Sequence, residues 1–494
     1  MESAPQPPEL SILQPSPEYA QAILACDILQ SNGFEAVVVG GAVRDMMLGE
    51  EPKDYDLATS ASPAQIVALP GFERSEYHDT AQAYGVSRVR LGDSEIEVAS
   101  YRKDVEAHLG REATQVDLGA TLEDDLERRD FTINAIALDP VTSQLFYQPQ
   151  ALSDLDSKTI RFVGDGSERI REDPLRIIRA VRFRNKLGFE YEAQTHLDIK
   201  QAVAQGELGS ISGERLRIEI TAILVSAQSR QKAIEDLDEL GIIDKLLPEL
   251  SAGKGVEQGV EFHAEGDVWV HQLLIMEALP RDASPELIWS ALLHDIGKPS
   301  KQKLPEDSTG RITFHGHDVT SEELARPILN RLKFSNKQKD DILWLIEKHI
   351  NIAQLPKMKP SNQKKMMNHP MFADLLELHR ADGLASWRTM PDGTISKEKA
   401  SFAEIEKIWQ EHLSQPVEVR APSVKRDLGI SGQDIISLMP GFDKTQDSRL
   451  IGLVLSELEE QYANGIFGSR DEALQIARDS ILAARPSTPS INLD

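Results

Sequence analysis

The sequence contains a single cysteine, Cys26, among its 494 residues. One cysteine excludes an intrachain disulfide and a zinc cluster built from thiolates. The sequence also lacks any run of about 18 apolar residues, the length that a membrane span needs. Its first twenty residues are acidic and proline-rich, without the basic flank or apolar core of a signal peptide. We therefore expect a cytoplasmic protein that does not associate with membranes.

Acidic residues outnumber basic ones, and the formal net charge is -26. This charge argues against extensive binding to nucleic acid, which depends on neutralising phosphates. The net charge does not describe local fields, however. Between residues 169 and 186 the basic side chains outnumber the acidic ones, and they are Arg169, Arg171, Arg176, Arg179, Arg182, Arg184 and Lys186. This basic strip predicts a small, transient contact with RNA.

A chain of this length is too long for one hydrophobic core, so several domains are expected. Short β-rich runs alternate with helical patterns up to about residue 147, and helical periodicity dominates from about residue 165. The fold class is therefore α+β, with a small sheet and helices in the N-terminal head and all-α parts after it. The expected parts are a disordered tail (1–16), the head (17–150), a helical neck (151–250), a histidine-rich helical domain (258–395) and a helical C-terminal tail (396–494).

A glycine turn follows the first β-rich run. We expect a buried strand at 37–39, a turn at Gly40 and Gly41, and a helix over 42–48. Glycines let a phosphate approach the backbone, and a helix start offers free N–H groups and a positive dipole. Arg44 would project from the first helical turn toward the same anion. The segment therefore predicts a phosphate-binding turn.

Two carboxylates, Asp54 and Asp56, follow this turn on an apparent strand. Positions i and i+2 of a strand share one face, so the pair can bridge two Mg²⁺ ions near a phosphate. Glu97, on the apparent strand IEVAS that begins at residue 96, is the candidate for a third carboxylate. An isolated Asp-x-Asp is more often a turn or a solvated edge, but its position after the glycine turn favours catalysis.

Four segments resemble class II tRNA nucleotidyltransferases and poly(A) polymerases. They are GGAVRDMMLGEEPKDYDLAT from residue 40, LEDDLERRDFTINAIALD from 122, REDPLRIIRAVRF from 171 and ISGERLRIEI from 211. The resemblance implies addition of CMP and AMP from CTP and ATP to the 3′ end of tRNA, without a nucleic-acid template. CC-adding, A-adding and poly(A)-adding members are the alternatives. A charged loop at 102–122 resembles the family's element linked to the switch from CTP to ATP, which favours complete CCA addition.

The resemblance puts Asp130 and Asn134 against the ribose and Arg129 near the triphosphate. Asp130 can accept a hydrogen bond from a hydroxyl, and Asn134 can both donate and accept. The two side chains together can test for a 2′-hydroxyl, the group that distinguishes ribonucleotides. The structural alternative is a helix start that carries solvated charges.

The resemblance also makes Glu172, Asp173 and Arg176 an amino-acid template for the base, with Arg179 in the same nucleotide site. Asp173 can accept from the exocyclic amine of cytosine or adenine, while Arg176 donates to a ring nitrogen or carbonyl. Uracil and guanine place a carbonyl at that position and would be rejected. In the structural alternative, Asp173 caps a helix that begins at Pro174, and Arg176 forms an i,i+3 ion pair.

Residues 261–387 hold eight of the twelve histidines. Within them HAEGDVWVHQLLIMEAL, LLHDIGKP, FHGHDVTSEELA and LHRADGLAS resemble an HD domain, a helical metal-dependent phosphohydrolase domain. The metal ligands that the resemblance implies are His271, His294, Asp295 and Asp382, with His317 or His315 extending the site to a second ion and His263 lining it. Imidazole and carboxylate ligands without thiols accept Mn²⁺, Ni²⁺, Co²⁺ or Fe²⁺. Hydrolysis of 2′,3′-cyclic or other phosphate esters and a scaffolding role for tRNA are both open.

Overall fold

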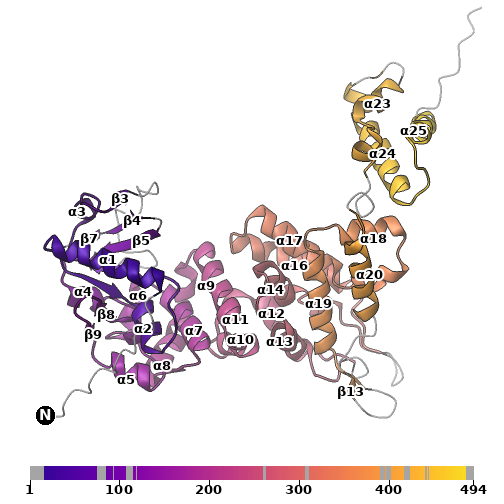
Figure 1. The fold of residues 1–494 in the computed structure, drawn as a ribbon. Coiled ribbons are helices and arrows are strands. Elements are labelled where there is room, and N and C mark those ends of the chain that lie inside the picture. Colours follow the sequence, from indigo (N-terminus) through magenta and orange to yellow (C-terminus); the bar gives the residue numbers. More distant parts are fainter. Residues whose placement is uncertain are drawn as a thin grey trace, which may run out of the picture. The chain divides into compact units, whose positions relative to one another are not determined.

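The structure is a computed structural model that describes residues 16–74, 85–92, 94–106, 115–117, 119–259, 263–305, 311–389, 395–396, 402–416, 423–439, 442 and 444–484. The chain forms two compact units. Unit 1 comprises residues 1–251 with 328–334, and unit 2 comprises residues 252–327 with 335–494. Both units are drawn in Figure 1. Apart from Ser16, the expected disordered tail (1–16) lies outside the described residues.

A seven-stranded mixed sheet organises the first half of unit 1, in the order β3-β4-β5-β2-β1-β8-β9. Its strands are β1 (Ala36–Val39), β2 (Leu57–Thr59), β3 (Glu73–Arg74), β4 (Val86–Leu91), β5 (Ser94–Ser100), β8 (Ile136–Asp139) and β9 (Gln144–Tyr147). The pairs are antiparallel except for β2 with β5, which are parallel. All four residues of β1 are buried, as a β-branched run in a central strand predicts.

Helices account for most of the rest of unit 1. They are α1 (Pro17–Ser31), α2 (Gly41–Met47), α3 (Pro63–Ile66), α4 (Leu122–Glu127), α5 (Ala151–Asp156), α6 (Gly166–Glu172), α7 (Leu175–Leu187), α8 (Ala193–Gln205), α9 (Gly213–Ser226), α10 (Arg230–Glu239), α11 (Ile242–Leu246) and α12 (Pro248–Ser251). Two 3₁₀ turns, η2 (Thr132–Asn134) and η3 (Glu207–Ser210), and the short parallel pair β10 (Thr159–Ile160) with β11 (Glu190–Tyr191) complete it. The α+β class is confirmed.

An aromatic cluster fastens α7 to the segment that holds the second motif. Phe131 stacks on Phe162 with ring centroids 5.1 Å apart, and Phe183 of α7 meets Phe131 edge-on at 5.6 Å. Such pairs contribute about 0.5–1.5 kcal/mol each beyond the area that they bury. The residues that flank Phe131 are thereby held beside α7.

The segment expected as a charged loop at 102–122 contains regular structure. β6 (Lys103–Glu106) pairs with β7 (Gln115–Asp117) as an antiparallel two-stranded ribbon, and α4 begins at Leu122. The expectation of a loop is therefore wrong for these strands. Residues 107–114 and 118 lie outside the described residues.

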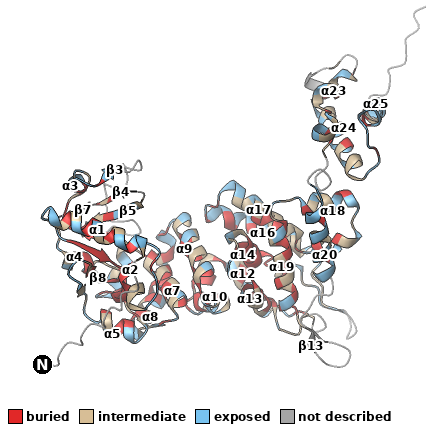
Figure 2. Cartoon of the chain, viewed as in Figure 1, coloured by how far each residue is buried: buried red, intermediate tan, exposed pale blue. Residues whose placement is uncertain are grey.

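Unit 2 is helical in its described parts, apart from the two-residue strands β12 (Arg388–Thr389) and β13 (Ile395–Ser396). Its helices are α13 (Val268–Ala278), α14 (Pro285–Leu293), α15 (Lys298–Lys301), α16 (His317–Arg331, of which residues 328–331 count with unit 1), α17 (Asn336–Lys348), η4 (Asn351–Lys357), α18 (Pro360–Met367), α19 (Phe372–Ala385), α20 (Phe402–Ser414), α22 (Val424–Leu428), α23 (Gly432–Ser437), α24 (Lys444–Ala463) and α25 (Arg470–Ala484). α13 packs on α19 and α14 on α17, and their facing sides are buried (Figure 2). Each helix that the structure describes is too short or too polar to span a bilayer.

Candidate functional site

The carboxylate pair Asp54 and Asp56 lies immediately before β2, and both residues are exposed. The Val39 N–H donates to the Asp56 carbonyl at 3.0 Å, and the chain then turns away from the sheet at Gly40. The residues before Asp56 therefore have no backbone hydrogen-bonding partner in β1. The prediction that Asp54 and Asp56 lie on a strand is wrong for this reason, although Asp56 does lie beside the glycine turn.

Glu97 lies close to Asp56. The parallel register of β2 and β5 puts the two residues at the same level of the sheet. Although the Asp56 side chain is exposed, protein atoms shield one side of it, and this desolvation followed by the Glu97 charge raises its pKa. Asp54 adds to the rise and the Arg129 guanidinium opposes it. A divalent cation would relieve the repulsion among three carboxylates, and oxygen ligands suit Mg²⁺.

Gly40 lets a guanidinium approach the turn. Its φ of +73° is unfavourable for other residues, and a Cβ there would lie 2.8 Å from Nη1 of Arg129. Arg129 is held from the other side by Asp125, with 3.1 Å between Nη2 and the carboxylate. The strand, glycine turn and helix expected at 37–48 are confirmed, and they put a fixed positive charge next to Gly40.

A network of polar side chains surrounds Asn134. Arg44 lies in the first turn of α2 as expected, but it is buried, pairs with Asp45 and donates to the Asn134 side-chain oxygen at 2.6 Å. The Asn134 amide donates to Asp130 at 3.0 Å, and Arg179 of α7 donates to the same carboxylate at 2.8 Å. Burial alone would raise the pKa of Asp130, but Arg179 and Asn134 outweigh it and lower the pKa to about 2.

The expected template residues lie where α6 meets α7. Asp173 is the C-cap of α6, and the N-cap of α7 is Pro174, so the alternative that Asp173 caps a helix beginning at Pro174 is wrong. One oxygen of Asp173 accepts from the Leu175 N–H at 3.2 Å, and the other binds Arg215 of α9 at 2.7 Å. Arg176 pairs with Glu172 at i,i+4, with 2.6 Å between the charged groups. The alternative of an i,i+3 pair with Asp173 is therefore wrong. Sequence reasoning missed Arg215, although it stands in the fourth motif.

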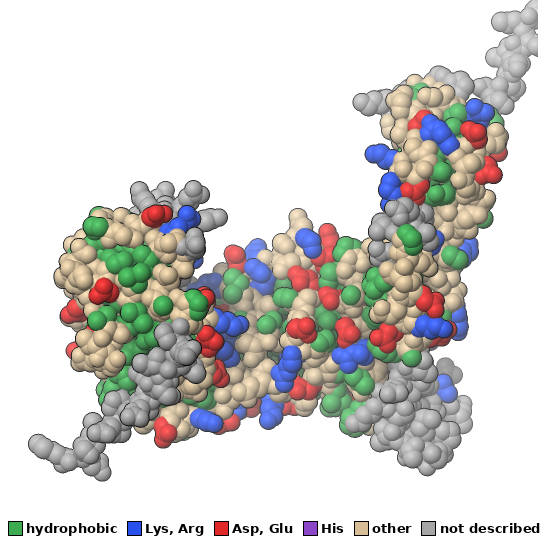
Figure 3. Space-filling model, in the orientation of Figure 1, with side chains coloured by type: hydrophobic (Ala, Val, Ile, Leu, Met, Phe, Trp, Pro, Cys, Tyr) green, Lys and Arg blue, Asp and Glu red, His purple; other side chains and the backbone are tan. Residues whose placement is uncertain are grey.

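Most charges of the basic strip are compensated within the protein. Six of its seven cations have a carboxylate within 4.0 Å, in the pairs Arg169–Glu172, Arg176–Glu172, Arg179–Asp130, Arg182–Glu219, Arg184–Asp236 and Lys186–Asp45. On the face drawn in Figure 3, acidic and basic side chains are interspersed in both units. These pairs join α6 and α7 to their neighbours, and the small, transient contact of the strip with RNA stays a prediction.

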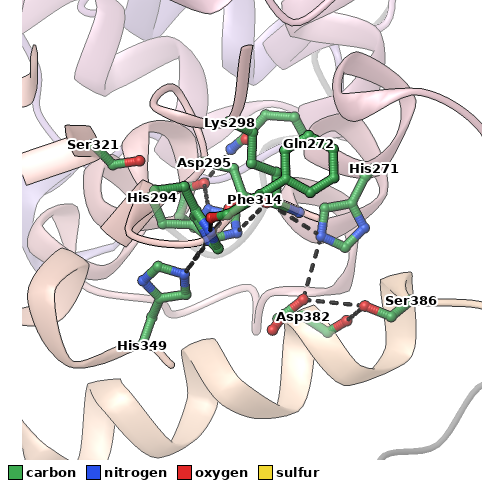
Figure 4. Close-up of polar contacts among 12 residues, drawn as sticks. His271, Gln272, His294, Asp295, Lys298, Phe314, Ser321, His349, Asp382 and Ser386 are labelled. Carbon is green, nitrogen blue, oxygen red and sulfur yellow. Dashed lines mark hydrogen bonds and ion pairs between the residues drawn. The ribbon is translucent and has the colours of Figure 1, made fainter. Parts of the chain in front are cut away.

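Unit 2 brings the expected metal ligands together. His294 and Asp295 follow α14, His271 lies on α13 and Asp382 on α19. Nε2 of His271 is 3.3 Å from Asp382 and 3.7 Å from Asp295, and Nε2 of His294 is 3.2 Å from Asp295. Figure 4 shows the His271 ring directed at the neighbouring Asp382 carboxylate.

Two further histidines lie near the other carboxylate oxygen of Asp295. Nε2 of His317 is 3.1 Å from Asp295, and Nε2 of His349 is 3.9 Å from it. The two Nε2 atoms are 3.3 Å apart. His315 is exposed, so the structure favours His317 of the two alternatives. His349 was missed because a single histidine at the end of a helix carries no motif of its own.

The donor atoms of this cluster fit a metal centre. Three ring Nδ1 atoms contact the carbonyl three residues earlier, in the pairs His294–Ala291 (2.9 Å), His317–Phe314 (2.8 Å) and His349–Ile346 (2.6 Å). A carbonyl can only accept, so the ring proton is on Nδ1 and Nε2 offers its lone pair. Nε2 of His271 and of His294 are buried and form no hydrogen bond, and the buried Asp295 has the Lys298 ammonium 2.7 Å from one of its oxygens. Buried polar atoms without hydrogen bonds are costly unless a cation compensates them.

Three family models match the chain. The poly A polymerase head domain matches residues 36–161, the probable RNA and SrmB-binding site of polymerase A matches 188–254, and the HD domain matches 268–379. The A-adding tRNA nucleotidyltransferase of Deinococcus radiodurans is 33% identical over 455 residues, covering 89% of this chain and 94% of the relative. This chain belongs to the tRNA nucleotidyltransferase and poly(A) polymerase family.

Other members of the family are similar over shorter stretches or in fold. The multifunctional CCA protein of Actinobacillus pleuropneumoniae is 33% identical over 348 residues, covering 68% of this chain and 80% of the relative. The Bacillus stearothermophilus CCA-adding enzyme in complex with CTP has a TM-score of 0.64 at 24% identity, covering 95% of this chain and 99% of that one. The chain thus has the fold of this family, and residues 268–379 match the model of the HD domain.

Proposed function

We propose that this chain adds CMP and AMP to the 3′ end of tRNA, using CTP and ATP and no nucleic-acid template. The observation that carries the proposal is the continuity of the head network. Asp56 lies at the glycine turn beside Arg129. Asp130 follows Arg129 in the chain, and its carboxylate accepts from Asn134 and from Arg179 of α7. Carboxylates for metals and the helix with the template residues therefore belong to one connected site of unit 1.

In the proposed reaction the 3′-oxygen of tRNA attacks the α-phosphorus of the nucleotide, and the bond to pyrophosphate breaks. Asp54 and Asp56 would hold Mg²⁺, with Glu97 adding negative charge. The ions supply activation of the attacking hydroxyl and stabilisation of the leaving pyrophosphate. Gly40, Gly41, Arg44 and Arg129 are assigned to the triphosphate side, where a preorganised guanidinium needs no rearrangement as charge develops.

The sugar and the base would be read by the other half of the network. The second amide hydrogen of Asn134 is available to a ribose oxygen, since its first is donated to Asp130. Asp173 and Arg176 are assigned to the base edge, with Glu172 and Arg179 beside them. Because Arg215 already holds one oxygen of Asp173, the carboxylate meets the exocyclic amine in a fixed orientation.

Addition of AMP alone is the second candidate, because a relative that is similar over 89% of this chain is an A-adding enzyme. Two tRNA substrates separate the candidates, one ending before the first C of CCA and one ending in CC. Incubation with each labelled nucleotide alone and then with both measures what is added. Label from CTP on the first tRNA and from ATP on the second supports CCA addition. Label from ATP on the second tRNA only overturns it in favour of A addition.

We infer a second, separate activity at the HD domain: metal-dependent hydrolysis of phosphate esters such as 2′,3′-cyclic phosphates. His271, His294, Asp295, His317 and Asp382 would hold the ions, and His349 joins them in this structure. Imidazoles favour Mn²⁺, Ni²⁺, Co²⁺ or Fe²⁺. Hydrolysis of a 2′,3′-cyclic nucleotide that is lost in His294→Ala supports this activity. Metal binding without turnover of any phosphate ester would leave a scaffolding role instead. Both activities suit a cytoplasmic protein.

A further inference from the structure

Glu265 is a buried carboxylate that lies outside the residues matched by the three family models. It precedes α13, and its side chain is 0% exposed. One of its oxygens contacts two imidazoles, Nδ1 of His263 at 2.6 Å and Nδ1 of His271 at 3.0 Å. A carboxylate is rarely buried unless it has a strong partner. The burial of Glu265 beside a candidate metal ligand therefore indicates a specific interaction between the two side chains.

His271 differs from the other three imidazoles of the HD cluster. His294, His317 and His349 each direct Nδ1 to a carbonyl of the preceding turn, whereas Nδ1 of His271 meets a side chain from outside its helix. An ionised carboxylate can only accept, so it keeps the ring proton on Nδ1. Nε2 of His271 is then left with its lone pair directed at Asp382, 3.3 Å away.

Glu265 also joins the two segments that carry these ligands. Its second oxygen accepts from the Trp387 N–H at 2.8 Å, and the Ala264 N–H donates to the Trp387 carbonyl at 2.8 Å. Trp387 follows the end of α19, the helix that holds Asp382. One carboxylate therefore orients the His271 ring and fastens the chain after α19 to the chain before α13.

We propose that Glu265 is a positioning residue of the HD metal centre, which holds His271 as an Nε2 ligand and keeps it in register with Asp382. The inference rests on the proposed metal site. An anionic acceptor on Nδ1 makes the imidazole a stronger ligand than a carbonyl does, and losing such a partner typically weakens metal binding by about 10–100-fold. Glu265 itself does not contact the substrate in this proposal.

Cobalt binding to the full-length, metal-stripped protein tests the proposal, with Co²⁺ as the probe and the visible spectrum as the readout. Glu265→Gln keeps the shape of the side chain and removes its charge. We expect the dissociation constant for Co²⁺ to rise roughly 10–100-fold and the spectrum to change. Glu277→Gln removes the same charge from an exposed position of α13 and should leave both unchanged.

The thermal midpoint of the metal-free protein separates positioning from folding, and it should be alike in Glu265→Gln and wild type. Equal Co²⁺ affinity and an identical spectrum in Glu265→Gln would overturn the role of Glu265 alone. Failure of the wild type to bind Co²⁺, or unchanged binding in His294→Ala, would instead overturn the proposed HD metal site.

Discussion

The two centres of this protein hold their carboxylates in opposite surroundings. Asp54 and Asp56 of the head are exposed, whereas Asp295 of the HD domain and the histidines His271 and His294 next to it are buried. Mg²⁺ is commonly bound by one or two carboxylates together with substrate phosphates. The head therefore suits an ion that arrives with the nucleotide. The HD cluster has already lost its hydration, so it suits an ion that stays bound.

The largest expected effect separates the two centres. Asp56→Ala removes a proposed ligand of the head and several kcal/mol of transition-state stabilisation, on the order of 10³-fold in rate. Transfer of label to tRNA should fall accordingly, while hydrolysis of a 2′,3′-cyclic nucleotide stays unchanged. His294→Ala should have the reverse pattern. Loss of both activities in either variant would show that the centres are not independent.

A smaller loss of transfer is expected from Gly40→Ala. The added Cβ would lie 2.8 Å from Nη1 of Arg129, so the guanidinium would have to shift. A misplacement of about 1 Å in a reactive site costs on the order of 10²-fold in rate. Gly49→Ala is the matched control, since Gly49 also has a positive φ, +76°, but open space around its Cβ position. Equal transfer rates for the two alanine variants would mean that the approach of Arg129 to the turn does not matter.

Asp130→Asn tests the network by stability. The pKa of Asp130 is lowered from 3.8 to about 2, which corresponds to about 2 kcal/mol. A lowered carboxyl pKa stabilises the fold above the unfolded value and loses this contribution as pH falls through the folded value. In urea unfolding the variant should thus be weaker by about 2 kcal/mol at pH 7, and the difference should shrink between pH 4 and pH 2. A constant difference at all pH values would contradict the assignment.

The smallest effect, on the free energy of unfolding, is expected at an exposed ion pair of the head. Arg88 is 3.4 Å from Glu97, and their side chains are 49% and 45% exposed. Exposed ion pairs contribute about 0.2–1 kcal/mol. Arg88→Gln should therefore change the free energy of unfolding by less than about 1 kcal/mol. A larger loss, measured by urea titration, would show that Glu97 depends on this partner.

Local patterns were predictable from the sequence wherever one short segment carries all the information. The valine run and Gly40 specify strand and turn through backbone preferences, and His294 with Asp295 are neighbours in the chain. The boundary at Asp54 was not predictable, because the strand stops where its partner β1 turns away. The ion pairs within the basic strip were not predictable for a similar reason: Glu219 and Asp236, which pair with Arg182 and Arg184, lie on other helices.

The sequence by itself determined the fold class, the order of the motifs and most of the ligand types, since periodicity and motif spacing are properties of the chain. Tertiary structure alone decided which distant side chains complete each centre. Arg215, Glu265 and His349 are single polar residues whose roles arise only when packed helices bring them within hydrogen-bonding range of Asp173, His271 and Asp295. The burial that removes water from the HD cluster is likewise a product of packing, and it makes the preference for a bound cation strong.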